Sequence, residues 1–284
     1  MQKPFFSIIV VSLNPGERLK KTLESIVSQT FSDYEVILKD GGSTDGKLRE
    51  LKEQGFFEKY PKIRVIEEKD KSIYDGMNQA VTYVKGSYVQ FLNCGDYFYN
   101  KTVLEQVAKE IYRLEVINQQ TVDKEKTPVI YYGNQYNQIQ ETVVYSAPQI
   151  NDFTCYRNVP CHQVCFYDAG LFQKRAYDLK YKVRGDYEHF LHSIYEEKAM
   201  GVALPIIVAS YEGGGFSETK ENRKKSASEH REITEKYLGK RKVFRYRMIM
   251  LLTLAPVRTW IAENPALSGI YNGLKNTIYR VMKK

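Results

Sequence analysis

The chain has 284 residues, of which 43% are hydrophobic and 27% charged, and its formal net charge is +8. This composition excludes a mainly disordered chain, and the length allows one large domain with an appendage. Four cysteines in a chain of this length do not suggest a disulfide framework, so we expect a reducing compartment. No stretch reaches the roughly 18 unbroken apolar residues of a membrane-spanning helix.

The first hundred residues alternate between strand and helix patterns. The β-branched run Phe6–Ser12 fits a first strand better than a signal peptide, and an apolar stripe over 17–29 predicts a helix. Further strands are expected at Glu35–Lys39, Arg64–Glu67 and Tyr88–Asn93, with helices between them. The alternation predicts an α/β fold with a mostly parallel central sheet flanked by helices.

Beyond residue 100 the pattern becomes less regular. We expect a helix over 101–114, followed after a polar loop by a β-hairpin formed by Val129–Tyr132 and Thr142–Tyr145. No linker separates the two halves, so residues 1–216 are expected to form one domain with halves 1–100 and 101–216. The composition changes near 217, and residues 217–284 are expected to form a helical basic appendage.

The positive charge is concentrated in this appendage. Residues 220–284 hold 16 Lys or Arg against five Glu, a net of +11, which leaves −3 for residues 1–219. A basic tail on a mildly acidic body favours an anionic partner, either a membrane surface or nucleic acid.

Polar side chains stand where each expected parallel strand ends, and these ends meet at one edge of a parallel sheet. The set comprises Ser12, Asn14, Asp40, Ser43, Lys71, Asp75, Asn93 and Asp96. Carboxylates at this edge could accept hydrogen bonds from the N–H and O–H groups of a nucleotide's base and ribose. Hydroxyl groups and a lysine could bind its phosphates, and Asp96 could bind Mg²⁺ or Mn²⁺. Taken singly, the aspartates could equally cap helices or form turns.

Two further motif classes are disfavoured. The chain lacks GxGxxG after its first strand and lacks GxxxxGK[ST], which counts against dinucleotide enzymes and P-loop NTPases. His162 with Cys155, Cys161 and Cys165 invites a zinc interpretation. Adjacent Cys161 and His162 cannot easily face one tetrahedral ion, and no paired C-x₂-C knuckles exist, so we disfavour zinc.

Three segments together carry a family resemblance: FSIIVVSLNPGERLKKTLESIVSQTFSDYEVILKDGGSTDG, EEKDKSIYDGMNQAV and GSYVQFLNCGDYF. In this order they resemble the family-2 glycosyltransferases of the GT-A fold, especially those that build bacterial surface polysaccharides. The match is close over about residues 4–100 and looser to about 215. It implies a Rossmann-related, GT-A-like sheet, with a first half that binds a nucleotide sugar, commonly a UDP-sugar, and a second half that shapes the acceptor site.

The resemblance also implies roles for individual residues. Ser12 and Asn14 would lie against the nucleotide, and Asp40 would contact the base. Ser43, Lys71 and Asp75, which we expect at the same edge of the sheet, are the other candidates for the nucleotide-sugar side. Asp96 matches the last acid of a DxD-type metal motif, and Asn93 stands where the first acid often occurs. Asp186 matches the general base, with Glu188 as second choice. His162 and Gln163 look like acceptor-side or diphosphate-side residues.

The implied activity is inverting sugar transfer to a glycan or polyprenyl-linked acceptor at the cytoplasmic face of a bacterial membrane. The basic segment 240–260 would lie on an anionic membrane surface, without a role for nucleic acid. The alternative for the tail is packing on the catalytic domain or on a second subunit as a homodimer. Two other functions stay open: a sugar nucleotidyltransferase of related fold, and a non-catalytic membrane or nucleic-acid adaptor.

Overall fold

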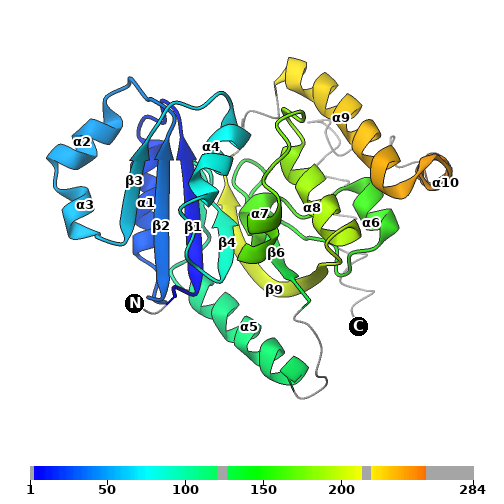
Figure 1. Cartoon of the computed structure of the whole chain (residues 1–284), viewed down its shortest axis with the longest axis horizontal. Coiled ribbons are helices and arrows are strands. Elements are labelled where there is room, and N and C mark those ends of the chain that lie inside the picture. The colour runs from blue at the N-terminus through cyan, green and yellow to red at the C-terminus, as the bar shows by residue number, and fades with distance from the viewer. Residues whose placement is uncertain (1–2, 120–126, 213–218, 254–284) are drawn as a thin grey trace. The chain divides into compact units, whose positions relative to one another are not determined.

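The computed structural model describes residues 3–119, 127–212 and 219–253 (Figure 1). The chain divides into two compact units, Met1–Ile233 and Thr234–Lys284. The domain boundary expected at 216/217 and the part of the basic tail beyond residue 253 lie outside the described residues.

The first hundred residues form the expected succession of strands and helices. The elements are β1 (Phe6–Ser12), α1 (Arg18–Val27), β2 (Tyr34–Asp40), α2 (Lys47–Glu53), α3 (Phe56–Lys59), β3 (Ile63–Glu67), α4 (Ile73–Val81) and β4 (Tyr88–Phe91). β1 pairs in parallel with β2 and β4, and β2 pairs in parallel with β3. The carboxyl ends of these four strands therefore meet at one edge of the sheet.

The second half extends the same sheet. Its elements are β5 (Tyr97–Phe98), α5 (Val103–Gln119), β6 (Val129–Asn137), β7 (Thr142–Val144), α6 (Asp152–Arg157), the 3₁₀ turn η1 (His162–Val164), β8 (Cys165–Asp168), α7 (Ala169–Lys174), α8 (Gly185–Tyr195) and β9 (Met200–Tyr211). β6 and β7 form an antiparallel hairpin, but Gln135–Asn137 pair with β7 in it, whereas the expected strand Val129–Tyr132 pairs with β8 and β9.

The described strands form one sheet in the order β3-β2-β1-β4-β8-β6-β9-β5, with β7 beside β6. β8 runs antiparallel to both β4 and β6, whereas β6 and β9 are parallel. The α/β class is thus confirmed, with a parallel first half and a mixed second half. Placing β8 between the halves brings the preceding turn η1 next to the end of β4.

The sequence of β1 is a continuous apolar run because both faces of this strand are buried in the core. Phe6, Ile8, Ile9 and Val10 are all at most 1% exposed, so both faces of the strand are covered. In Figure 1, α4 lies in front of the strands and α1 lies behind them. Helices cover both faces, so the polar loops at the carboxyl edge are the part of the sheet open to a ligand.

Two helices follow the sheet: α9 (Lys220–Leu238) and α10 (Lys240–Leu252). In the first unit, Glu229 accepts hydrogen bonds from the backbone N–H groups of Lys182, Val183 and Arg184 at 2.8–3.0 Å. This carboxylate holds the loop that leads into α8. Among the described residues, no helix is sufficiently long and apolar to cross a membrane.

Candidate active site

Asp40 stands at the end of β2, opposite Ser12 at the end of β1. Its Oδ1 accepts from the Ser12 hydroxyl at 3.1 Å and from the Ser43 hydroxyl at 2.6 Å. Its Oδ2 accepts from the N–H groups of Gly42 at 3.0 Å and Ser43 at 2.8 Å. Burial alone would raise the pKa of Asp40, but the hydrogen bonds from Ser43, Gly42 and Ser12 outweigh it and lower the pKa. Asp40 is therefore a fixed anion.

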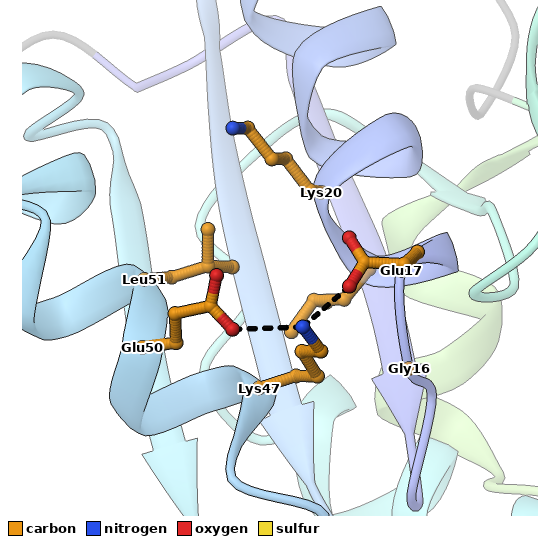
Figure 2. Close-up of a pocket in the computed structure, with 7 residues that line it drawn as sticks. Gly16, Glu17, Lys20, Lys47, Glu50 and Leu51 are labelled. Atoms are coloured by element: carbon orange, nitrogen blue, oxygen red, sulfur yellow. Dashed lines mark hydrogen bonds and ion pairs between the residues drawn. The ribbon is translucent and has the colours of Figure 1, made fainter.

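The loop after β1 is tied to this corner. Asn14, at φ +47°, donates its N–H to the Ser43 hydroxyl at 2.8 Å, and its Oδ1 accepts from the Thr44 N–H at 2.8 Å. Figure 2 shows that Lys47 lies between Glu17 and Glu50, which links the starts of α1 and α2. Ser12, Asn14, Asp40 and Ser43 are thus brought together, as the parallel topology predicts.

A cavity of about 400 Å³ opens beside this corner. Its lining includes Asp40, Ser43 and Thr44 on one side and Arg49, Lys52 and Glu67 on the other. This volume falls in the range of small-molecule sites, about 300–1,000 Å³. Asp40 lies at the wall of this cavity and already accepts four hydrogen bonds, so a ligand N–H or O–H group would have to share an oxygen with these donors.

The loop before α4 lies against the same corner. A Cβ on Gly41 would come within 2.5 Å of the Asp70 carboxylate, and one on Gly76 within 2.9 Å, so a side chain at either position would displace this carboxylate. One carboxylate oxygen of Asp75 already has a donor within its own loop, because Oδ2 accepts a hydrogen bond from the Lys71 backbone N–H at 2.8 Å. The Lys71 side chain is exposed next to this loop.

A cation that the sequence analysis did not single out lies beneath the loop. The Lys39 ammonium is fully buried and donates to the carbonyl oxygens of Asp40 and Glu68 and to Asp70 Oδ2 at 3.2 Å. No local pattern distinguishes this lysine from the exposed lysines of the chain.

Asp96 follows β4 and is only 6% exposed. The Thr22 hydroxyl donates to its backbone carbonyl at 2.8 Å, and Gln163 Nε2 donates to its Oδ2 at 2.9 Å. Burial raises the pKa of Asp96 to about 6, although the bond from Gln163 and the nearby His162 act in the opposite direction. Burial of Asp96 thus outweighs the groups that stabilise its ionised form.

A row of hydrogen bonds runs from β4 to α8. His162 Nδ1 lies 3.0 Å from Asp186 Oδ2, and His162 Nε2 lies 2.8 Å from Asn93 Nδ2. Since an ionised carboxylate only accepts, Nδ1 carries the hydrogen, and Nε2 accepts from the Asn93 amide. In this arrangement Asn93 Oδ1 is buried and has no hydrogen-bond partner among the described residues.

Asp186 lies in the first turn of α8, and three groups donate to it. These are His162 Nδ1, the Tyr74 hydroxyl at 2.9 Å and the Tyr187 N–H at 2.9 Å. Burial alone would raise the pKa of Asp186, but His162, Tyr74 and the Tyr187 N–H outweigh it and lower the pKa. The carboxylate is therefore held ionised between both halves of the domain.

Glu188 occupies a different environment from the one expected. Its side chain is fully buried, and its Oε2 lies 2.7 Å from Arg175 Nη2 in an ion pair. This ion pair engages the Glu188 carboxylate, whereas the Asp186 side chain is 24% exposed, so the structure favours Asp186 over Glu188 as the candidate base. The four cysteines are free, and in the described ranges no three His, Cys, Asp or Glu side chains gather as a metal cluster.

Comparisons with known proteins identify the family of the chain. A family model described as Glycosyl transferase family 2 matches residues 7–176. A PGL/p-HBAD biosynthesis glycosyltransferase of Mycobacterium bovis (strain BCG / Pasteur 1173P2) is 30% identical over 262 residues, which cover 92% of each chain. Chondroitin synthase of Escherichia coli is 35% identical over 94 residues, covering 33% of this chain and 13% of that protein.

Solved structures share the fold. S. aureus TarS 1–349 in complex with UDP-GlcNAc has a TM-score of 0.62 at 17% identity, covering 82% of this chain and 71% of that chain. In another structure of TarS 1–349 the coverage of that chain is 60%. Mannosyltransferase PcManGT from Pyrobaculum calidifontis, in complex with GDP-Man and Mn²⁺, has a TM-score of 0.61 at 14% identity. The match covers 100% of this chain and 83% of that chain. The family model spans more than half of this chain, which therefore belongs to glycosyl transferase family 2 and is a glycosyltransferase of GT-A-like fold.

Proposed function

We propose that the enzyme transfers a sugar, with inversion at the anomeric carbon, from a nucleoside-diphosphate sugar to an acceptor hydroxyl. The observation that carries this proposal is the hydrogen-bonded row Asn93, His162 and Asp186 beside Asp96. It joins the end of a donor-side strand to an ionised carboxylate on an acceptor-side helix. Family membership removes the support for the nucleotidyltransferase and adaptor alternatives.

Asp186 is the general base in this proposal. Its carboxylate takes the acceptor hydroxyl proton while that oxygen forms a bond to the anomeric carbon. The bond between the anomeric carbon and the diphosphate oxygen breaks, and its electron pair leaves with the nucleoside diphosphate. His162 keeps the carboxylate oriented, because its Nδ1–H holds Oδ2 at 3.0 Å.

The corner at Asp40 binds the nucleotide in this proposal. Asp40 and Ser43 line the 400 Å³ cavity, and Asp40 has both oxygens fixed by donors. An oriented carboxylate suits the imide N–H of uracil, and the motif resemblance favours UDP-sugars, so we assign a UDP-sugar as the donor. Ser12 and Asn14 hold this corner through their hydrogen bonds to Asp40 and Ser43. We assign Lys71, which is exposed on the loop before α4, to the phosphates. The UDP-GlcNAc complex of TarS is consistent with this class.

The donor set at β4 fits a divalent ion. Asp96 is a carboxylate whose ionised form is disfavoured by burial, and Asn93 Oδ1 is a buried oxygen without a partner in the described structure. Hard oxygen ligands of this kind suit Mg²⁺ or Mn²⁺, which commonly bind one or two protein oxygens together with phosphates. Such an ion would supply electrostatic stabilisation of the departing diphosphate. The Mn²⁺ complex of PcManGT is consistent with this assignment.

We place the acceptor, a glycan or polyprenyl-linked glycan, at an anionic membrane surface on the cytoplasmic side. α10 contains five Lys or Arg and no acid, and Phe244, Met248, Leu251 and Leu252 on it are 39–79% exposed. Exposed large apolar side chains among basic ones suit the headgroup region of anionic lipid. The alternative partner for this helix is a second copy of the chain.

Calorimetric titration with UDP, GDP, CDP and ADP, each with Mn²⁺ and with EDTA, tests the donor assignment. We expect UDP to bind in Mn²⁺, and Asp40→Asn to weaken that binding about tenfold because an amide cannot replace an ionised acceptor. Asp33→Asn, at an exposed position outside the cavity, is the matched control. Equal binding of all four nucleotides, or none by any, would contradict the assignment.

A further inference from the structure

Tyr74 is a buried aromatic residue in the first turn of α4, directly after the loop that carries Asp70 and Lys71. It is 5% exposed. Its ring packs on the backbone where α8 begins, because a Cβ on Gly185 would come within 2.9 Å of ring carbons Cδ2 and Cε2. The absence of a side chain at Gly185 thus allows the donor-side helix to approach the acceptor-side helix.

The hydroxyl of Tyr74 reaches two acceptors on the other half of the domain. It lies 2.9 Å from Asp186 Oδ1 and 2.9 Å from the carbonyl oxygen of Val183. A phenol has one hydrogen to donate, and an ionised carboxylate is the stronger acceptor of the two. Burial raises the pKa of Tyr74 well above its usual value, so the hydroxyl stays protonated and remains a donor.

We infer that Tyr74 is a positioning residue that fixes the Asp186 carboxylate and couples it to the donor-side loop at 70–75. This inference rests on the proposed role of Asp186 as base. Tyr74 Oη and His162 Nδ1 hold the two carboxylate oxygens from different sides, so the rotamer of Asp186 is set by both halves of the domain.

The surroundings of Asp186 supply few competing charges. Six ionisable groups lie close enough to Asp186 for the pKa of one to affect that of the other. They are Tyr74 on α4, Cys161 just before η1, His162 on η1, Cys165 and Tyr167 on β8, and Tyr177. Burial raises the pKa of each of the thiols and phenols, so these groups are neutral. Hydrogen-bond donation, from Tyr74 and His162, is thus the main influence that a substitution can remove.

The chain offers a matched control in Tyr177. Its ring packs 5.2 Å from the Tyr74 ring and is as deeply buried, at 3% exposed. Its hydroxyl, however, has no hydrogen-bond partner among the residues that the structure describes. Tyr74→Phe and Tyr177→Phe therefore each remove one buried hydroxyl from the same aromatic cluster, and only the first removes a donor to Asp186.

The test compares the two variants with the wild-type protein, using UDP-glucose, UDP-N-acetylglucosamine and UDP-galactose as donors and p-nitrophenyl glycosides as acceptors. For Tyr74→Phe we expect kcat to fall about tenfold while the Kd for UDP stays within about twofold. The ratio of its kcat to that of Tyr177→Phe should fall further as the pH is lowered. A carboxylate that loses a donor has a higher pKa and is protonated at a higher pH.

Asp186→Asn separates failure of this inference from failure of the proposed function. If that variant loses transfer while Tyr74→Phe matches Tyr177→Phe in kcat and in pH profile, the inference on Tyr74 is overturned and the base assignment stands. If Asp186→Asn transfers at the wild-type rate, the base assignment itself fails. If Tyr74→Phe weakens UDP binding and leaves kcat unchanged, Tyr74 serves the donor site alone and the inference is also overturned.

Discussion

Replacing Lys39 by Met should reveal how the donor corner is stabilised. The Lys39 side chain is fully buried, and that of Asp70 is 12% exposed. Met keeps much of the apolar stem but leaves the Asp70 carboxylate unpaired and removes the donor to the Asp40 and Glu68 carbonyls. Removing one partner of a buried ion pair costs about 3–5 kcal/mol, because the other charge stays buried. That is a large share of a typical stability of about 5–15 kcal/mol.

The matched control is Lys52→Met. Lys52 pairs with Glu67 one residue before Glu68, but their side chains are 40% and 55% exposed. Removing an exposed pair of this kind costs about 0–1 kcal/mol. Urea titrations of both variants give the free energies of unfolding. The double variant Lys39→Met, Asp70→Asn should recover part of the loss, since it removes the orphaned charge. Equal losses in Lys39→Met and Lys52→Met would refute the reasoning.

Two further predictions follow from the site and the tail. Asp96→Asn should abolish the difference in UDP binding between Mn²⁺ and EDTA, measured by calorimetry; a retained Mn²⁺ enhancement would remove Asp96 as a ligand. Phe244→Ser with Leu251→Ser should weaken co-sedimentation with phosphatidylglycerol vesicles at least about tenfold, because each side chain contributes about 1.5–3 kcal/mol when buried. Val116→Ser, which changes a 55% exposed residue of α5, should leave co-sedimentation unchanged. If Phe244→Ser with Leu251→Ser instead converts a dimer to monomers, the result would favour packing of α10 on a second copy of the chain.

The donor half of the fold could be predicted because its signals are local. The strands of the first hundred residues are apolar runs that end on polar, glycine-containing corners, and parallel pairing places all such corners at one edge. Ser12 and Asp40 therefore become neighbours in register. The antiparallel strand β8, by contrast, depends on long-range pairing, and short apolar runs do not reveal their partners.

The acceptor half shows what the sequence alone could not decide. Asp186 and Glu188 are two residues apart in one helix, so their side chains point about 200° apart. Either could have faced the site, and only the packing shows that Asp186 meets His162 while Glu188 meets Arg175. Tyr74 was missed because its contact with Asp186 spans 112 residues.

The central claim is that the Asp186 carboxylate accepts the acceptor proton. The most direct measurement is the kcat of Asp186→Asn at saturating UDP-sugar, with the Kd for UDP determined on the same protein. The amide is nearly isosteric and cannot take up the proton, so we predict a fall in kcat of about 10²–10⁴-fold with the Kd changed less than about threefold. A kcat equal to that of the wild-type protein, at an unchanged Kd, would contradict the account.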